Sequence, residues 1–205
     1  MKLIEQPPLL YRKLFPGSIW RIPLATKKVV YLTFDDGPIP EITPWVLDLL
    51  KRLDVKATFF CVGDNVRKYP DIFKMVVDGG HRVGNHTFNH IQGIKTWTHN
   101  FQANTELAAQ YIDSDLFRPP HGHMRLPQHL ILRRKYKMIM WDVVTRDYSK
   151  HMTPEDVFEV VKKRTRDGSI IVFHDSLKSE TNMKGSLEKS IIWLKEQGYS
   201  FELIP

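Results

Sequence analysis

The sequence predicts an α/β fold on a mostly parallel sheet, either closed as a barrel or open and doubly wound. Short apolar runs, rich in β-branched and aromatic residues, alternate with longer amphipathic stretches along the chain. That alternation is typical of repeated strand–helix units. In addition, prolines near first helical positions and glycines at helix ends mark the borders of the units.

Seven apolar runs are expected to be strands, because each is short and bounded by turn residues. In chain order they are Val29–Phe34, Ala57–Val62, His81–Val83, Leu116–Phe117, Met138–Trp141, Ser169–Phe173 and Tyr199–Ile204. The amphipathic stretches between them are expected to be helices. These are Thr43–Leu53, Pro70–Asp78, Thr98–Ile112, Pro127–Lys135, Pro154–Arg164 and Thr181–Gln197. Thr43 and Thr153 each precede a proline and supply helix caps.

Size and composition indicate one soluble globular domain with a real core. The chain has 205 residues, of which 42% are apolar and 26% charged. Because Cys61 is the only cysteine, an intrachain disulfide and a cysteine-based zinc site are excluded. No apolar run approaches the ~18 residues that a membrane span needs. We expect an N-terminal segment, residues 1–28, to pack on a domain formed by residues 29–205.

The N-terminal residues 1–23 do not resemble a signal peptide, because Pro7 and Pro8 interrupt them. Their mixture of Leu, Tyr, Phe and Trp with Arg12 and Lys13 favours packing over one end of the domain, with a membrane surface as the alternative. Without a signal peptide or a membrane span, the sequence alone indicates the cytoplasm, and export by a route that uses no cleavable signal stays open as the alternative.

The net charge of +7 favours acidic partners such as nucleic acid, anionic lipid or an anionic glycan. The basic residues are scattered, however, and the densest cluster, residues 133–137, fits a solvated helix face. Since no recognition motif accompanies the charge, nucleic acid is not expected as a partner.

Chemically active side chains follow five of the predicted strands. They are Asp35 and Asp36, His86 and His90, Arg118, Asp142, and His174 with Asp175. The carboxyl ends of parallel strands meet on one face, which carries the active site in such folds. Taken singly, each of these features fits an ordinary structural role: an Asp-Gly turn, a chance histidine pair, a rigid Arg-Pro-Pro loop or a satisfied buried histidine. Their convergence indicates a shared site.

One carboxylate and two imidazoles from this set suit a divalent metal. Histidines four residues apart share a helix face, and a carboxylate from another strand end completes three ligands with an open position. Zinc suits this set, as do Fe(II), Co and Ni. At the turn Gly37-Pro38, Asp35 and Asp36 can diverge, so that one binds metal and the other acts as a base, which argues against a glycosidase. With a histidine acid opposite, the arrangement indicates amide or ester hydrolysis.

From about Val29 to Ile204 the chain resembles the polysaccharide deacetylases of the NodB-homology type, carbohydrate esterase family 4. The similarity rests on five motifs: Thr33–Gly37, His86–His90, Arg118–Gly122, Trp141–Tyr148 and Val172–His174. The first two, at this spacing, are highly specific. The resemblance implies a distorted (β/α) barrel of seven or eight mostly parallel strands. It also implies metal-dependent removal of acetyl groups from N-acetylated or O-acetylated sugars or polysaccharide.

The resemblance assigns a role to each motif residue. The catalytic set would be Asp35 as base, His174 as acid and Arg118, which orients Asp35. The metal ligands would be Asp36, His86 and His90, holding one divalent ion, with Zn²⁺ as first choice and Co²⁺ or Ni²⁺ as alternatives. The substrate-binding set would be Pro120, His121, Trp141 and Tyr148, and the backbone N–H of His121 would also bind the oxyanion.

Departures from the family pattern keep a second function open. His121 stands where Tyr is usual, and Tyr148 where Trp is common. Val144 stands where an Asp usually supports the acid histidine, which leaves Asp142 or Asp147 to take that place. These changes motivate the alternative of a glycan-binding protein on the same fold with weak or lost catalysis. The segments 91–97 and 146–152 are further candidates for substrate contact.

Overall fold

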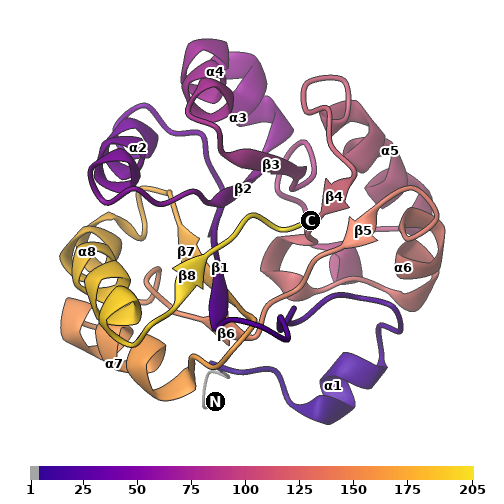
Figure 1. Ribbon diagram of the computed structural model, residues 1–205. Helices are drawn as coiled ribbons and strands as arrows, with labels where there is room; N and C mark the ends of the chain where they lie inside the picture. Colours follow the sequence, from indigo (N-terminus) through magenta and orange to yellow (C-terminus); the bar gives the residue numbers. More distant parts are fainter. Residues whose placement is uncertain (1–4) are drawn as a thin grey trace.

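The computed structural model describes residues 5–205, which form one curled parallel sheet enclosed by helices (Figure 1). The strands are β1 Val29–Asp35, β2 Thr58–Cys61, β3 Arg82–Asn85, β4 Leu116–Phe117, β5 Lys137–Met138, β6 Val143–Val144, β7 Ser169–His174 and β8 Ser200–Phe201. Their order is β5-β4-β3-β2-β1-β7-β6, and β8 pairs with the beginning of β1. Every strand pair is parallel. The predicted fold class, a distorted (β/α) barrel, is confirmed.

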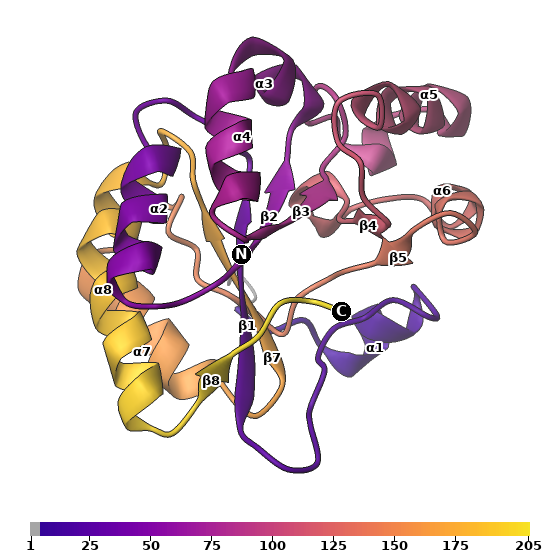
Figure 2. The ribbon, with the colours of Figure 1, turned by 45° about the horizontal axis from the view of Figure 1, so that its top comes forward.

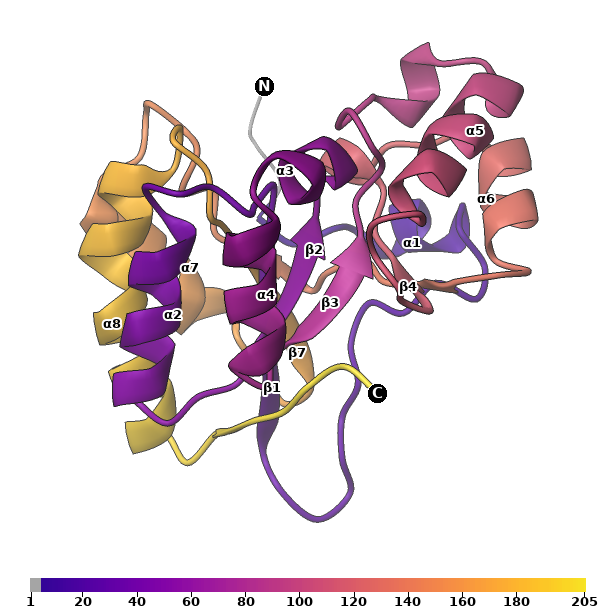
Figure 3. The same cartoon turned by 90° about the horizontal axis from the view of Figure 1, so that it is seen from above.

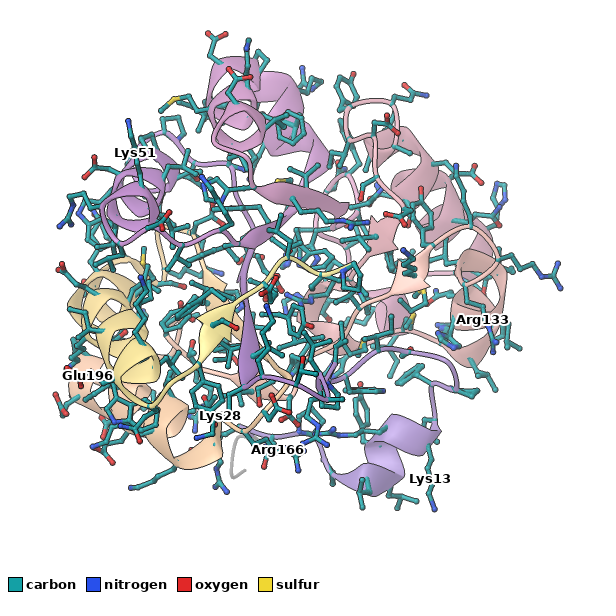
Figure 4. The ribbon with its side chains drawn as sticks, viewed as in Figure 1. Lys13, Lys28, Lys51, Arg133, Arg166 and Glu196 are labelled. Atoms are coloured by element: carbon teal, nitrogen blue, oxygen red, sulfur yellow. The ribbon has the colours of Figure 1, made fainter. Side chains whose placement is uncertain are left out.

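Helices surround the sheet as a ring. They are α1 Leu9–Lys13, α2 Thr43–Arg52, α3 Gly63–Lys68, α4 Pro70–Asp78, α5 Thr98–Ala108, α6 Leu126–Leu132, α7 Pro154–Arg164 and α8 Glu180–Glu196, with 3₁₀ turns η1 Gly93–Lys95 and η2 Pro120–Gly122. Figures 2 and 3 show α2, α7 and α8 on one side of the sheet and α5 and α6 on the other. Lys51 of α2 and Glu196 of α8 point outward, as expected for the polar faces of amphipathic helices (Figure 4).

The predicted bounds of α4 and α7 agree with the structure. In α7, the Thr153 hydroxyl accepts from the amide of Asp156, whose carboxylate accepts from the amide of Thr153. This capping box and Pro154 fix the first turn. The helix then buries Val157 and Val161 against the sheet.

The structure differs from the prediction mainly at short elements. The predicted strand Met138–Trp141 is Lys137–Met138. The amide of Ile139 still donates to Phe117 of β4, and Ile139 also bridges to Ile19 of the N-terminal segment. The helices α1 and α3 and the strand β6 were not expected. A single helical turn carries no periodicity, and Val143–Val144 lies only one residue past the predicted strand Met138–Trp141. The last strand is confined to Ser200–Phe201.

The N-terminal segment packs between α6 and α7 in the ring (Figure 1). Ile19 bridges to Ile139, and Arg21 bridges to Ser169 at the start of β7. Phe15 and Trp20 are buried in a hydrophobic cluster with residues of β4 and β5. Residues 1–4 of the predicted segment 1–28 lie outside the described residues. Among residues 5–205, no helix has the length and apolar character required to cross a bilayer.

Candidate active site

The carboxyl ends of β1, β3, β4 and β7 deliver their side chains to one place. The register of the sheet pairs Asp35 of β1 with His174 of β7, so these two residues emerge side by side. They border a cavity of about 540 Å³ that Asp36, His86 and His90 also line. The convergence of strand ends that the sequence predicts is therefore present for these five residues.

Asp36, His86 and His90 form a cluster with the composition of a divalent metal site. Each offers one ligand atom, and these atoms lie within 4.8 Å of one another. Asp36 Oδ1 is 3.0 Å from His90 Nε2 and 3.7 Å from His86 Nε2. A carboxylate oxygen with two imidazole nitrogens is a donor set that suits zinc.

The surroundings of His86 favour metal binding through Nε2. Its Nδ1 lies 2.7 Å from the carbonyl oxygen of Arg118, to which Nδ1–H donates, leaving the Nε2 lone pair directed toward Asp36. Burial lowers the pKa of His86 to about 4, so the ring is neutral at physiological pH. Burial raises the pKa of Asp36, but the hydrogen bond from His90 and the charge of His174 outweigh it, and the net direction is down.

The two histidines lie in a loop after β3, and the prediction that they share a helix face is wrong. Thr87 and His90 have left-handed backbone angles, with φ of 64° and 53°, which curl the loop so that both rings face Asp36. The amides of Phe88 and Asn89 donate to the side chain of Asn104 on α5. A braced, strained loop thus provides the spacing that a helix was expected to give.

Arg118 fixes the position of Asp35. Its Nη1 donates to Asp35 Oδ1 at 2.6 Å and to Thr33 Oγ1 at 2.8 Å. The rest of the fully buried guanidinium donates to the carbonyl oxygens of Ile139 and Met140. Because each of the three guanidinium nitrogens donates a hydrogen bond, the Asp35 carboxylate is held in one orientation toward the cavity.

Asp147 takes the place beside His174 for which Val144 offers no carboxylate. Asp147 Oδ1 lies 2.7 Å from His174 Nδ1, and Oδ2 accepts from the His174 amide at 2.8 Å. Burial lowers the pKa of His174, but the charge and hydrogen bond of Asp147, with smaller contributions from Asp36 and Asp35, raise it to about 9. The imidazole is therefore protonated at neutral pH, as a general acid requires.

Asp142 does not belong to this site, in contrast to the expectation from its place after a predicted strand. It precedes β6, at the opposite end of the sheet, where its amide donates to the carbonyl oxygen of Ile170. Its carboxylate is fully buried and accepts hydrogen bonds from Arg12, Arg166 and Ser169. The role of Asp142 is structural.

The turn after Asp36 is held by Asp175. The Asp175 carboxylate accepts from the amide of Gly37 at 3.0 Å and from Thr43 Oγ1 at 2.7 Å. A Cβ on Gly37 would lie 1.9 Å from Asp175 Oδ2, so only glycine allows this approach. Burial raises the pKa of Asp175 to about 8.

Three of the four predicted substrate-binding residues border the cavity. They are His121, Trp141 and Tyr148. Among the described residues that line the cavity, Pro120 is absent, as is the whole segment 91–97, and Tyr148 alone represents the segment 146–152. The ring of Tyr148 meets His174 edge to face at 4.9 Å, and that of His121 lies 4.8 Å from His90.

Sequence reasoning missed several residues that line the cavity. They are Pro7, Pro8, Tyr11, Gly122, His123, Ser176 and Lys178. Gly122 is the last residue of the predicted motif Arg118–Gly122 but was given no role there. His123 and Ser176 lie just past predicted motifs, so adjacency alone suggests them. No local signal marks Pro7, Pro8 or Tyr11, because their approach depends on packing between distant parts of the chain.

Comparison with known proteins gives the family of the chain. The model of the polysaccharide deacetylase family matches residues 24–137, more than half of the chain. The chain belongs to the polysaccharide deacetylase family. A peptidoglycan-N-acetylglucosamine deacetylase of Bacillus cereus is 31% identical to it over 209 residues, which cover 94% of each chain. The peptidoglycan-N-acetylglucosamine deacetylase PgdA of Listeria monocytogenes is 34% identical over 214 residues. The match covers all of the present chain and 44% of the length of PgdA.

Solved structures show the same fold. The Bc1960 peptidoglycan N-acetylglucosamine deacetylase superposes with a TM-score of 0.85 at 30% identity, covering 97% of this chain and 95% of that one. BA3943 of Bacillus anthracis, a pseudoenzyme of carbohydrate esterase family 4, superposes with a TM-score of 0.78 at 29% identity, covering 97% and 71%. The fold of this family thus occurs in a deacetylase and also in a pseudoenzyme.

Proposed function

We propose that this polysaccharide deacetylase removes acetyl groups from N-acetylated sugars of peptidoglycan, with one divalent ion, first of all zinc, at Asp36, His86 and His90. The observation that carries the proposal is the joint presence of the ligand cluster, the Arg118-bound Asp35 and the Asp147-bound His174 on one cavity. The relatives that act on peptidoglycan support the substrate class. The net charge of +7 also suits approach to an anionic wall polymer.

A divalent ion in this cluster would supply Lewis acidity, polarising the acetyl carbonyl and lowering the pKa of a water. Asp35 takes the proton of the attacking water through the oxygen that Arg118 leaves free. The amide of His121 donates to the oxygen that becomes negative. His174, kept protonated by Asp147, gives its proton to the leaving nitrogen as the C–N bond breaks. Acetate and a free amine result.

Aromatic and basic side chains on the cavity walls suit a sugar substrate. Trp141 and Tyr148 offer aromatic surface suited to the apolar face of a pyranose. Lys178 lines the cavity and is exposed, so it is available to an anionic group on the glycan.

A glycan-binding protein with weak or lost catalysis is the second candidate. It is favoured by His121 in place of the usual Tyr, and by the similarity to a pseudoenzyme of the same family. Against it stands the intact pair of Asp147 and His174, which compensates for Val144.

The test is release of acetate from purified peptidoglycan, from N-acetylglucosamine oligomers and from an aryl acetate. We expect release by the zinc-loaded protein, loss after chelation, and recovery on adding zinc, cobalt or nickel. Asp48→Asn, which makes the same Asp-to-Asn change on the exposed face of α2, is the matched control for Asp35→Asn. Binding of the glycans without turnover under all metal conditions would favour the second candidate, and activity that survives complete metal removal would refute the proposed chemistry.

A further inference from the structure

The N-terminal strap, residues 5–12, borders the cavity although it contains none of the five motifs. Pro7, Pro8 and Tyr11 line the cavity beside His121 and Gly122. Tyr11 of the strap lies 111 residues before Gly122 in the sequence. The strap therefore forms a wall of the candidate active site that the rest of the domain does not provide.

Both ends of the strap are fixed. At Glu5, the carbonyl oxygen accepts from the amide of Val144 at 2.9 Å, and the carboxylate pairs with Arg164 at 2.9 Å. At the other end, Arg12 donates to the buried carboxylate of Asp142 at 2.7 Å and to the carbonyl oxygen of Pro7 at 2.9 Å. With both ends held by ion pairs and hydrogen bonds, the strap has a defined position.

Tyr11 extends from the strap to the turn that contains His121. Its hydroxyl donates to the carbonyl oxygen of Gly122 at 2.6 Å. Its ring packs edge to face on Phe15 at 5.5 Å and on Trp20 at 6.0 Å. Burial raises the pKa of Tyr11 to about 12, so the hydroxyl keeps the proton that it donates.

The turn that Tyr11 contacts is strained. His121 and Gly122 have successive left-handed backbone angles, with φ of 58° and 68°. A Cβ on Gly122 would lie 2.0 Å from Trp141, so the backbone is pressed against that ring. The turn closes through the amide of Gly122, which donates to Pro119, and that of His123, which donates to Pro120. The backbone amide of His121 takes part in neither of these two hydrogen bonds. A strained turn keeps one shape only where its surroundings hold it.

We propose that Tyr11 is a positioning residue, which holds the His121–Gly122 turn so that the His121 amide points at the developing oxyanion. The inference rests on the proposed function. The strap would then be part of the active site, since a small misplacement of a donor removes much of its effect on a transition state.

The test compares Tyr11→Phe with Tyr111→Phe. The first keeps the ring and removes only the hydroxyl, and the second removes a hydroxyl from an exposed tyrosine that packs on Phe88, outside the cavity. For Tyr11→Phe we expect kcat on an N-acetylglucosamine oligomer to fall about three- to tenfold with KM within about twofold, the range of one lost hydrogen bond. In the metal-free protein, the rate of hydrogen exchange at the Gly122 backbone amide should rise by a similar factor. Tyr111→Phe should change neither.

The outcomes separate the inference from the function. Unchanged kcat in Tyr11→Phe, or a rise in KM alone, would overturn the positioning role. If the wild-type protein releases no acetate from any substrate, the proposed function fails. The exchange rate of the Gly122 amide then decides alone: faster exchange in Tyr11→Phe supports the tie between strap and turn, and an unchanged rate overturns it.

Discussion

Replacing Asp147 by Asn should shift the basic limb of the pH–rate profile to lower pH. Asp147 binds both the ring and the amide of His174, and its negative charge is what keeps the partly buried imidazole protonated. Asparagine preserves the size of the side chain and removes that charge. Since only the protonated ring can give a proton to the leaving group, the variant should lose activity at a pH where the wild-type protein still works.

The magnitude follows from the pKa of His174, about 9 in the structure against 6.5 for a free histidine. If the variant returns to about 6.5, the protonated fraction at pH 8 drops from about 0.9 to about 0.03, a loss of about thirtyfold. At pH 6 the two proteins should differ by less than about twofold in this fraction.

The assay is kcat for acetate release from pH 5.5 to 10, together with an NMR titration of the His174 ring. Stability provides a second readout with a defined sign. Because the folded pKa lies above the unfolded value, the ion pair stabilises fully below pH 6.5, and that contribution disappears as the pH rises through about 9. Asp147→Asn should flatten this dependence, whereas Asp64→Asn on the surface helix α3 should retain it.

A basic limb that stays in place in Asp147→Asn would refute the reasoning, provided that the variant is folded. An equal loss of activity at every pH would likewise show that Asp147 acts on structure and not on the proton of His174.

Four further outcomes are expected. Asp35→Asn in zinc-loaded protein should lower acetate release by about 10²–10⁴-fold, with thermal unfolding as the check on folding. Zinc at about 100 times its Kd should stabilise the wild-type protein by about 2.7 kcal/mol in calorimetry, and His90→Ala should remove most of that gain. Arg118→Met leaves the Asp35 carboxylate buried and unpaired, so urea unfolding should show a loss of about 3–5 kcal/mol. Gly37→Ala should cost about 1–3 kcal/mol because its Cβ meets Asp175, and Asp175→Ala in the same chain should recover part of the loss.

The fold and the centre of the site were predictable because they are encoded in local patterns. Apolar runs and caps indicate strands and helices, and titratable residues just past those runs indicate which side chains meet. His86 and His90 were correctly brought together, but through a loop with left-handed residues that no periodicity indicates. The contact between Asp147 and His174 depends on the path of the chain after β6. The comparison of Val144 with the Asp usual in the family does not define that path.

The N-terminal strap illustrates what sequence patterns omit. Tyr11 and Pro7 look like parts of a mixed apolar segment, and their approach to the cavity arises from contacts with residues more than a hundred positions away. Asp142 shows the reverse case. It follows an apolar run as the site residues do. However, β5 already ends at Met138, and Asp142 lies before β6, where it accepts a hydrogen bond from Ser169 at the start of β7.

The partners of the strap have a consequence for how the protein is made. Gly122, Asp142, Val144 and Arg164 all leave the ribosome long after residues 5–12 have emerged. The earliest part of the chain must therefore wait, without these partners, until α7 has been synthesised, and its docking closes some of the longest loops of the molecule. Completion of the catalytic pocket would then come late in folding, so that a nascent or truncated chain carries the ligand histidines without a working enzyme.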